Sequence, residues 1–180
     1  MQKVLVVYAS RHGATAGIAE RIGEVMRAEG LDVTVEDAAL VPDPREFDAY
    51  VIGSAAYIGK WEGAATSYAK RYAEIIAAKP CWLFSSGPVG TERVDKKGNS
   101  VLQDPTTVTE LVPLLHPRGT QVFFGAWDPS VPSASLAERV VRNIPAIKDL
   151  LPTGDFREWP VIDAWARSVA RDVKEPVPIA

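Results

Sequence analysis

Residues 4–15 read VLVVYASRHGAT. Val4 to Ala9 form a continuous apolar and aromatic run, which is the pattern of a strand covered on both faces. A polar turn follows, and after it Ile18 and Ile22 begin an apolar repeat with the spacing of one helix face. This order of strand, turn and helix is typical of the start of an α/β fold.

The alternation of strands and helices continues along the chain. Gly30 stands just past the first helical repeat, where a left-handed C-terminal cap is expected. Further strands are predicted at residues 31–35, 50–53, 81–85 and 122–125. Further helices are predicted at residues 63–78, 106–115, 134–143 and 160–173, and Pro145 is expected to kink or end the third of these. The pattern predicts one doubly wound domain at residues 1–175 and a C-terminal tail at residues 176–180.

Composition narrows the classes of function. The net charge is −3, and Lys and Arg are scattered, so we expect no nucleic-acid partner. The single cysteine, Cys81, excludes an internal disulfide and fits a reducing cytoplasm. The apolar run at residues 4–8 is too short for a transmembrane segment. We therefore expect a cytoplasmic protein and leave peripheral membrane contact open.

The turn at residues 10–15 is the main chemical clue. Backbone amides at a helix N-terminus point outward and attract anions, so a phosphate fits there. The hydroxyls of Ser10 and Thr15 would donate to it, and Gly13 would let the chain approach closely. We expect Arg11 to reinforce the field while pointing to solvent. The alternative is that Ser10 and Thr15 only cap the helix.

Other chemistries lack their residues. The sequence contains no Gly-x-x-x-x-Gly-Lys-Ser/Thr phosphate loop, no Gly-x-Gly-x-x-Gly and no Gly-x-Ser-x-Gly. Two histidines and one cysteine, far apart in the sequence, predict no metal site.

Two segments resemble the flavodoxin-like family. Residues 6–15 resemble its loop for the phosphate of FMN, and residues 47–55, FDAYVIGSA, resemble its third strand. The nearest branch is the quinone-dependent, flavodoxin-domain protoporphyrinogen oxidases, which GSAAYIG at 53–59 and Gly125-Ala126 resemble. The resemblance implies FMN as the cofactor and a three-layer sandwich with a five-stranded parallel sheet in the order 2-1-3-4-5.

The resemblance also implies a set of FMN-binding residues. Tyr57 and Trp61 would be walls for the flavin ring, Gly59 would present a peptide to it, and Lys60 would favour its anionic reduced form. Backbone amides after the fourth strand would hold its pyrimidine end, and Trp127 would line the rim of the substrate pocket. The full set is Ser10, Arg11, His12, Gly13, Ala14, Thr15, Ser54, Ala55, Ala56, Tyr57, Ile58, Gly59, Lys60, Trp61, Ser85, Ser86, Gly87, Gly90 and Trp127.

Two departures from the family bear on function. His12 stands where typical flavodoxins have a threonine, and a net charge of −3 is weak beside their strong acidity. We therefore expect an FMN-dependent oxidoreductase that oxidises protoporphyrinogen or a similar small molecule with a quinone acceptor. The alternatives are an electron-transfer protein that docks on a redox partner protein, and a flavin-free interaction domain.

Overall fold

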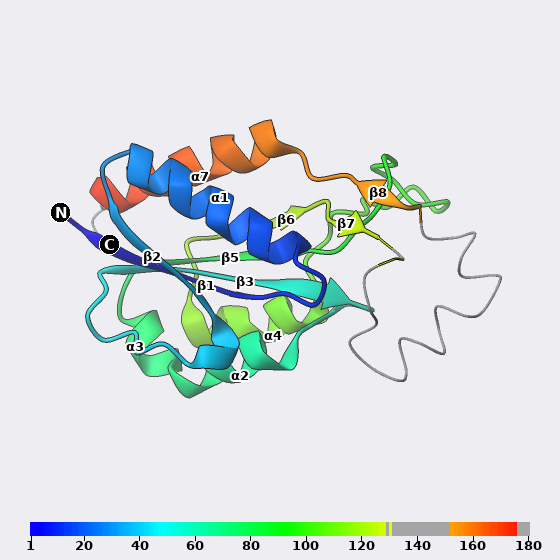
Figure 1. Cartoon of the computed structure of the whole chain (residues 1–180). Helices are drawn as coiled ribbons and strands as arrows, with labels where there is room; N and C mark the ends of the chain where they lie inside the picture. The colour runs from blue at the N-terminus through cyan, green and yellow to red at the C-terminus, as the bar shows by residue number, and fades with distance from the viewer. Residues whose placement is uncertain (129, 131–151, 176–180) are drawn as a thin grey trace.

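A parallel β-sheet forms the centre of the molecule (Figure 1). The computed structural model describes residues 1–128, 130 and 152–175. Within them the parallel strands run in the order β2-β1-β3-β5-β6, which confirms the predicted order. Their bounds are β1 Lys3–Ala9, β2 Asp32–Asp37, β3 Ala49–Tyr57, β5 Cys81–Ser86 and β6 Gly119–Phe123.

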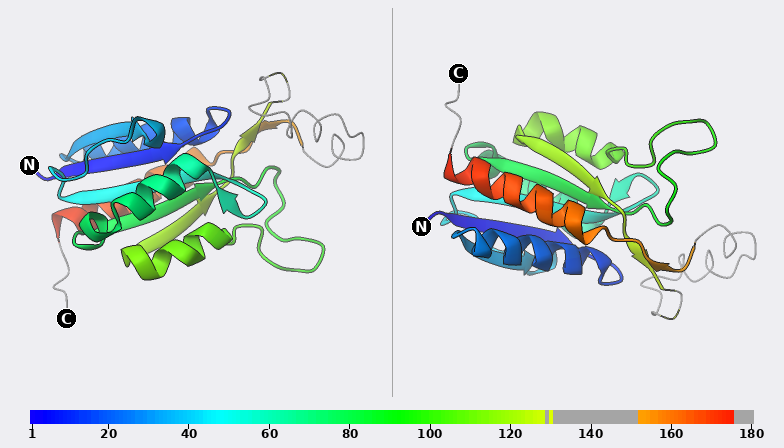
Figure 2. Two further views of the ribbon diagram at one scale, coloured as in Figure 1. Left: turned by 90° about the horizontal axis from the view of Figure 1, so that it is seen from below. Right: turned by 90° about the horizontal axis from the view of Figure 1, so that it is seen from above.

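Helices cover both faces of the sheet (Figure 2). On one face lie α1 (Ala14–Ala28) and α7 (Trp159–Lys174). On the other lie α2 (Gly63–Arg71), α3 (Ala73–Ala77) and α4 (Thr106–Leu115), and the short 3₁₀ helix η1 (Ala38–Leu40) follows β2. The three-layer α/β sandwich is thereby confirmed.

The two faces of β1 explain its unbroken apolar sequence. Val4 and Val6 pack in the core beneath α1 and α7, whereas Leu5 and Val7 pack in the core beneath α2 and α4. All four side chains are fully buried. Burying such a side chain contributes about 1.5–3 kcal/mol, so β1 is the central support of both cores.

Left-handed glycines bound helix α1. Gly13 precedes it with φ 86°, and Gly30 follows it with φ 87°. At the C-terminal end the Gly30 amide donates to the Arg27 carbonyl and the Leu31 amide to the Met26 carbonyl. This is the Schellman arrangement, and it confirms the predicted cap.

Three elements differ from the sequence prediction. The helix predicted at 63–78 is divided at Tyr72, which leaves the helical conformation (φ −109°, ψ 19°). The strand predicted at 122–125 lies earlier, as β6 at Gly119–Phe123. Its first three residues, Gly-Thr-Gln, are only partly buried, which is tolerated because an edge strand pairs on one side. The strand predicted at 50–53 is longer than expected: β3 continues to Tyr57 and turns back through β4 (Lys60–Trp61) in a β-hairpin.

The helices predicted at 106–115 and 160–173 are confirmed as α4 and α7. The helix predicted at 134–143, Pro145 and the tail at 176–180 lie outside the described residues. In the part of the chain that the structure describes, no helix combines the length and apolar character that crossing a membrane requires.

Candidate functional site

One cavity lies where β1, β3, β5 and β6 end. Its volume is about 370 Å³, within the range of about 300–1,000 Å³ typical of small-molecule sites. It is lined by Ser10, Arg11, His12, Ala14, Thr15, Ala55, Ala56, Tyr57, Ile58, Ser86, Gly87, Val89, Gly125, Ala126 and Trp127. This is the edge of a doubly wound sheet at which ligands bind.

The first loop, residues 10–15, closes through its own side chain. The Gly13 amide donates to Ser10 Oγ at 3.0 Å, and the first backbone bond within α1 runs from the Gly17 amide to the Gly13 carbonyl. The amides of residues 14–16 precede that bond, so they have no acceptor within the helix and point out of its N-terminus. No described side chain caps α1, and thus Ser10 holds the turn instead of capping the helix.

Thr15 and His12 bring different groups to the cavity from this loop. The Thr15 side chain is 1% exposed and lines the cavity. The His12 ring meets the Trp127 ring edge to face, with centroids 5.8 Å apart. Trp127 is placed by the two-stranded pair of β7 (Ala126–Trp127) and β8 (Gly154–Asp155). The histidine therefore brings an aromatic contact with Trp127 to the cavity.

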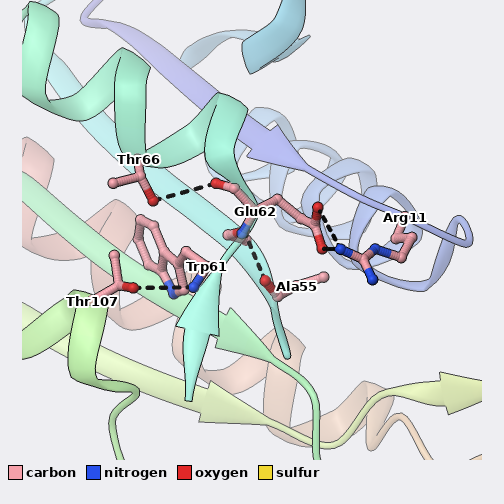
Figure 3. Close-up of polar contacts among 7 residues, drawn as sticks. Arg11, Ala55, Trp61, Glu62, Thr66 and Thr107 are labelled. Atoms are coloured by element: carbon pink, nitrogen blue, oxygen red, sulfur yellow. Dashed lines mark hydrogen bonds and ion pairs between the residues drawn. The ribbon is translucent and has the colours of Figure 1, made fainter. Parts of the chain in front are cut away.

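We expected Arg11 to point to solvent, but it points to the hairpin instead. Its guanidinium pairs with the Glu62 carboxylate at 2.9 Å (Figure 3) and also lies 4.6 Å from the centre of the Tyr57 ring. The side chain is 24% exposed. The cause is the β3–β4 hairpin, which brings Glu62 and Tyr57 beside the end of β1 and offers the cation both a carboxylate and a ring face.

The hairpin divides its residues between the cavity and the core. Its first strand and turn line the cavity with Ala55, Ala56, Tyr57 and Ile58. The structure places Ser54, Gly59, Lys60 and Trp61 outside that lining. Ser54 is buried and accepts the Glu62 amide at 2.9 Å, and Lys60 is exposed on the turn-back strand.

Trp61 is a core anchor and not a wall of the cavity. It is 6% exposed, its indole Nε1 donates to Ser85 Oγ at 2.8 Å, and its amide donates to Thr107 Oγ1 at 3.1 Å (Figure 3 shows the second bond). Ser85 is thus engaged by the hairpin and does not line the cavity. These bonds fix the hairpin to β5 and α4.

The chain after β5 approaches the hairpin closely. Ser86 and Gly87 line the cavity, and a Cβ at position 87 would lie 2.8 Å from the Ala56 carbonyl oxygen. Only glycine fits there without movement of β3. Gly90 (φ 106°) lies outside the lining, and a Cβ at this position would lie 3.4 Å from Pro152 Cγ.

Three lining residues were absent from the predicted set. These are Val89, Gly125 and Ala126. Each lies just beyond the end of β5 or β6, and the rule that ligands bind at the carboxyl ends of strands was the signal that could have found them.

The described part of the cavity wall carries positive charge and no negative charge. Among the described residues that line it, Arg11 is the only permanently charged side chain, and no carboxylate is present. The described residues also contain no group of His, Cys, Asp and Glu arranged to hold a metal ion. Cys81 lies elsewhere, in the core beneath α4, where burial raises the pKa of its thiol to about 12.

A family model of the flavodoxin domain matches residues 5–134. The chain belongs to the flavodoxin-domain family. No curated protein sequence matches it. Three solved structures illustrate the shared fold. A flavodoxin from Archaea is 17% identical with a TM-score of 0.55, over 96% of this chain and 99% of that one. Flavodoxin 2 from Bacillus cereus is 16% identical with a TM-score of 0.58, over 97% and 99%. Rubredoxin oxygen:oxidoreductase from Desulfovibrio gigas is 13% identical with a TM-score of 0.62, over 99% of this chain and 38% of that one.

Proposed function

We propose that this flavodoxin-domain protein binds FMN in the cavity and acts in redox chemistry. The observation that carries the proposal is the joining of two unlike surfaces in one space. At one end lies the N-terminus of α1, with no described side chain capping it, and at the other lie apolar and aromatic side chains. FMN has the same two parts, a phosphate and a flat apolar ring.

The first loop would hold the phosphate. The helix field and the amides of residues 14–16 favour a dianion, and the Ser10 and Thr15 side chains line the same end of the cavity. Gly13, which is exposed and outside the cavity lining, adopts the left-handed conformation that turns the chain into α1. These features fit a phosphate although His12 replaces one hydroxyl of the family.

The hairpin and the chain after β5 and β6 would hold the ring. Small side chains at Ala55 and Ala56 and a bare backbone at Gly87 provide flat walls, and Tyr57 and Trp127 add aromatic faces. Stacking on such a face contributes about 0.5–1.5 kcal/mol beyond area burial. Bound FMN supplies the uptake and release of electrons, whereas the protein supplies position and electrostatics.

The narrower part of the proposal is an enzyme that oxidises a small molecule, such as protoporphyrinogen, with a quinone as acceptor. Two segments support it. The segment 87–105 and the β7–β8 pair both extend beyond the strand ends, at the end of the sheet where the cavity lies (Figures 1 and 2). Long segments of this kind commonly build substrate pockets. An electron carrier that docks on a redox partner protein is the alternative. A cytoplasmic location, with peripheral contact to a membrane-held quinone, belongs to the same proposal.

The test is titration of the purified, flavin-free protein with FMN, followed by fluorescence quenching. We expect a dissociation constant below about 100 µM, which corresponds to roughly −5.5 kcal/mol. Absence of binding in this range would reject the proposal. Turnover of a porphyrinogen with a quinone in the absence of any protein partner would then support the enzyme, and its absence would favour the carrier.

A further inference from the structure

Arg11 occupies a special position because it touches both ends of the cavity. It is contributed by the first loop, and its guanidinium lies over the Tyr57 ring of the hairpin, 4.6 Å from the ring centre. The ring that the hairpin holds would therefore lie close to a fixed positive charge. In this inference, which rests on the proposed binding of FMN, the charge sets which redox state of the flavin is favoured.

The cation is fixed by Glu62. One guanidinium nitrogen of Arg11 reaches both carboxylate oxygens, at 2.9 and 3.2 Å (Figure 3). Glu62 is itself held by its backbone, because its amide donates to Ser54 Oγ and to the Ala55 carbonyl, and its carbonyl accepts Thr66 Oγ1. The carboxylate makes no capping bond to α2, although Glu62 stands at the N-cap position of that helix. It is directed to Arg11 instead.

The pair is arranged asymmetrically with respect to the cavity. Arg11 lines it, whereas Glu62 does not. A ligand in the cavity therefore meets the positive member of the pair first. The described lining residues add no carboxylate of their own to the cavity side of this pair.

The redox states of FMN differ in charge where this cation acts. Uptake of two electrons and one proton converts the neutral oxidised ring into a ring that carries one negative charge. The phosphate is charged in both states, so its attraction to Arg11 cancels when the two states are compared. A positive charge beside the ring stabilises the reduced state alone.

We propose that Arg11, positioned by Glu62, makes this cavity bind reduced FMN more tightly than oxidised FMN. The flavin is then poised to accept electrons from a reduced donor instead of delivering them at low potential. The sequence had assigned this role to Lys60, which lies on the turn-back strand, exposed and outside the cavity lining.

The experiment measures the ratio of the dissociation constants for oxidised and reduced FMN. The oxidised value comes from fluorescence titration, and the reduced value follows from the potentials of bound and free FMN under dithionite reduction, through the thermodynamic cycle. The variants are Arg11→Gln, Arg11→Lys and Glu62→Gln. Lys60→Gln is the matched control, because it removes the same charge from the same neighbourhood outside the cavity.

We expect Arg11→Gln to lower the ratio by about 10-fold or more, since a charge near the ring acts in a medium of low effective dielectric. Arg11→Lys, which keeps the charge, should stay within about three-fold of the wild type. Glu62→Gln removes the negative charge, while its amide oxygen can still accept from Arg11 and keep it in place, so this variant should raise the ratio. Lys60→Gln should change the ratio less than about two-fold because solvent and salt screen an exposed charge.

The proposal is overturned if Arg11→Gln changes the ratio no more than Lys60→Gln, or if Arg11→Lys lowers it as much as Arg11→Gln, since either result means a structural role. If Arg11→Gln does not fold, Glu62→Gln decides: a raised ratio supports the proposal and an unchanged one overturns it. A wild type that binds no FMN rejects the proposed function itself, which is a different result from FMN binding with an unchanged ratio.

Discussion

The two ends of the cavity are built in different ways. The first loop is held by near neighbours, since Ser10 bonds the amide of Gly13 and Gly13 bonds that of Gly17. The hairpin is held by residues far along the chain, since Trp61 bonds Ser85 and Thr107. One end is therefore encoded locally, whereas the other forms only when the whole domain is folded. Mutations of the residues that hold each end in place should accordingly affect the ligand at the first end and the fold at the second.

The largest expected effect is on stability, at the hairpin. Trp61→Ala removes a buried indole and its bonds to Ser85 and Thr107, and it should lower the free energy of unfolding by about 3–5 kcal/mol. Trp61→Phe, which keeps most of the ring volume, is the control and should lose less. Chemical denaturation of the flavin-free protein measures both. A loss below about 1 kcal/mol for Trp61→Ala, typical of surface sites, would show that the hairpin is not anchored as described.

The next effect is on ligand affinity, at the first loop. Thr15→Val keeps the side-chain volume and removes a hydroxyl at the phosphate end, so it should weaken FMN by about 10-fold. Riboflavin lacks the phosphate that this hydroxyl would contact, so it should bind within about two-fold of its wild-type affinity. A ten-fold change corresponds to about 1.4 kcal/mol. Parallel titrations with the two flavins make the measurement. Equal losses for both would mean that this loop does not hold the phosphate.

A smaller effect is expected at Tyr57. Tyr57→Ala removes an aromatic face of about 0.5–1.5 kcal/mol and should weaken FMN and riboflavin alike, because both carry the ring. Tyr57→Phe retains the face and should bind both flavins as the wild type does. A selective loss of FMN in Tyr57→Ala would place the phosphate, and not the ring, beside the hairpin.

The smallest effect concerns the helix that carries the first loop. Arg21 of α1 pairs with Asp163 of α7 at 2.7 Å, and the hydrogen bond from Arg21 lowers the pKa of that carboxyl. A lowered folded-state pKa adds stability above the unfolded value of about 4, and this stability is lost as the pH falls through the folded-state value. Asp163→Asn should therefore lower the melting temperature slightly at neutral pH.

Melting curves between neutral pH and pH 3 would show that difference shrinking as the carboxyl of the wild type becomes protonated. A difference that stays constant, or grows, on acidification would mean that the ionised pair does not stabilise α1 on α7. Ligand affinity at neutral pH should be unchanged, since Asp163 lies away from the cavity lining.

The sequence was most informative where structure is local. The apolar run of β1, the helix that follows it and the cap at Gly30 are all written in neighbouring residues, and the structure confirms them. The sheet order was implied by resemblance and is confirmed as well. Ser10, Thr15 and Tyr57, which the resemblance implies as FMN-binding residues, lie in the cavity lining.

The sequence was least informative about side-chain direction in the hairpin. In a sequence, an aromatic residue that contacts a ligand cannot be told from one that packs in the core. Trp61 lies in the core because its indole bonds Ser85 on another strand, and the sequence does not show this pairing. The same holds for Arg11, whose orientation depends on Glu62, 51 residues further on. Periodicity reports the face of an element, but such long-range polar pairs have no periodic signal.

The central claim is that one cavity holds both the phosphate and the ring of FMN, and amide chemical shifts test it most directly. In ¹H–¹⁵N correlation spectra, we predict that FMN shifts the amide signals of residues 14–16 and of Ser86 and Gly87 together. Riboflavin should shift Ser86 and Gly87 but leave residues 14–16 almost unmoved. If FMN leaves residues 14–16 unmoved, or shifts residues remote from the strand ends instead, the account is contradicted.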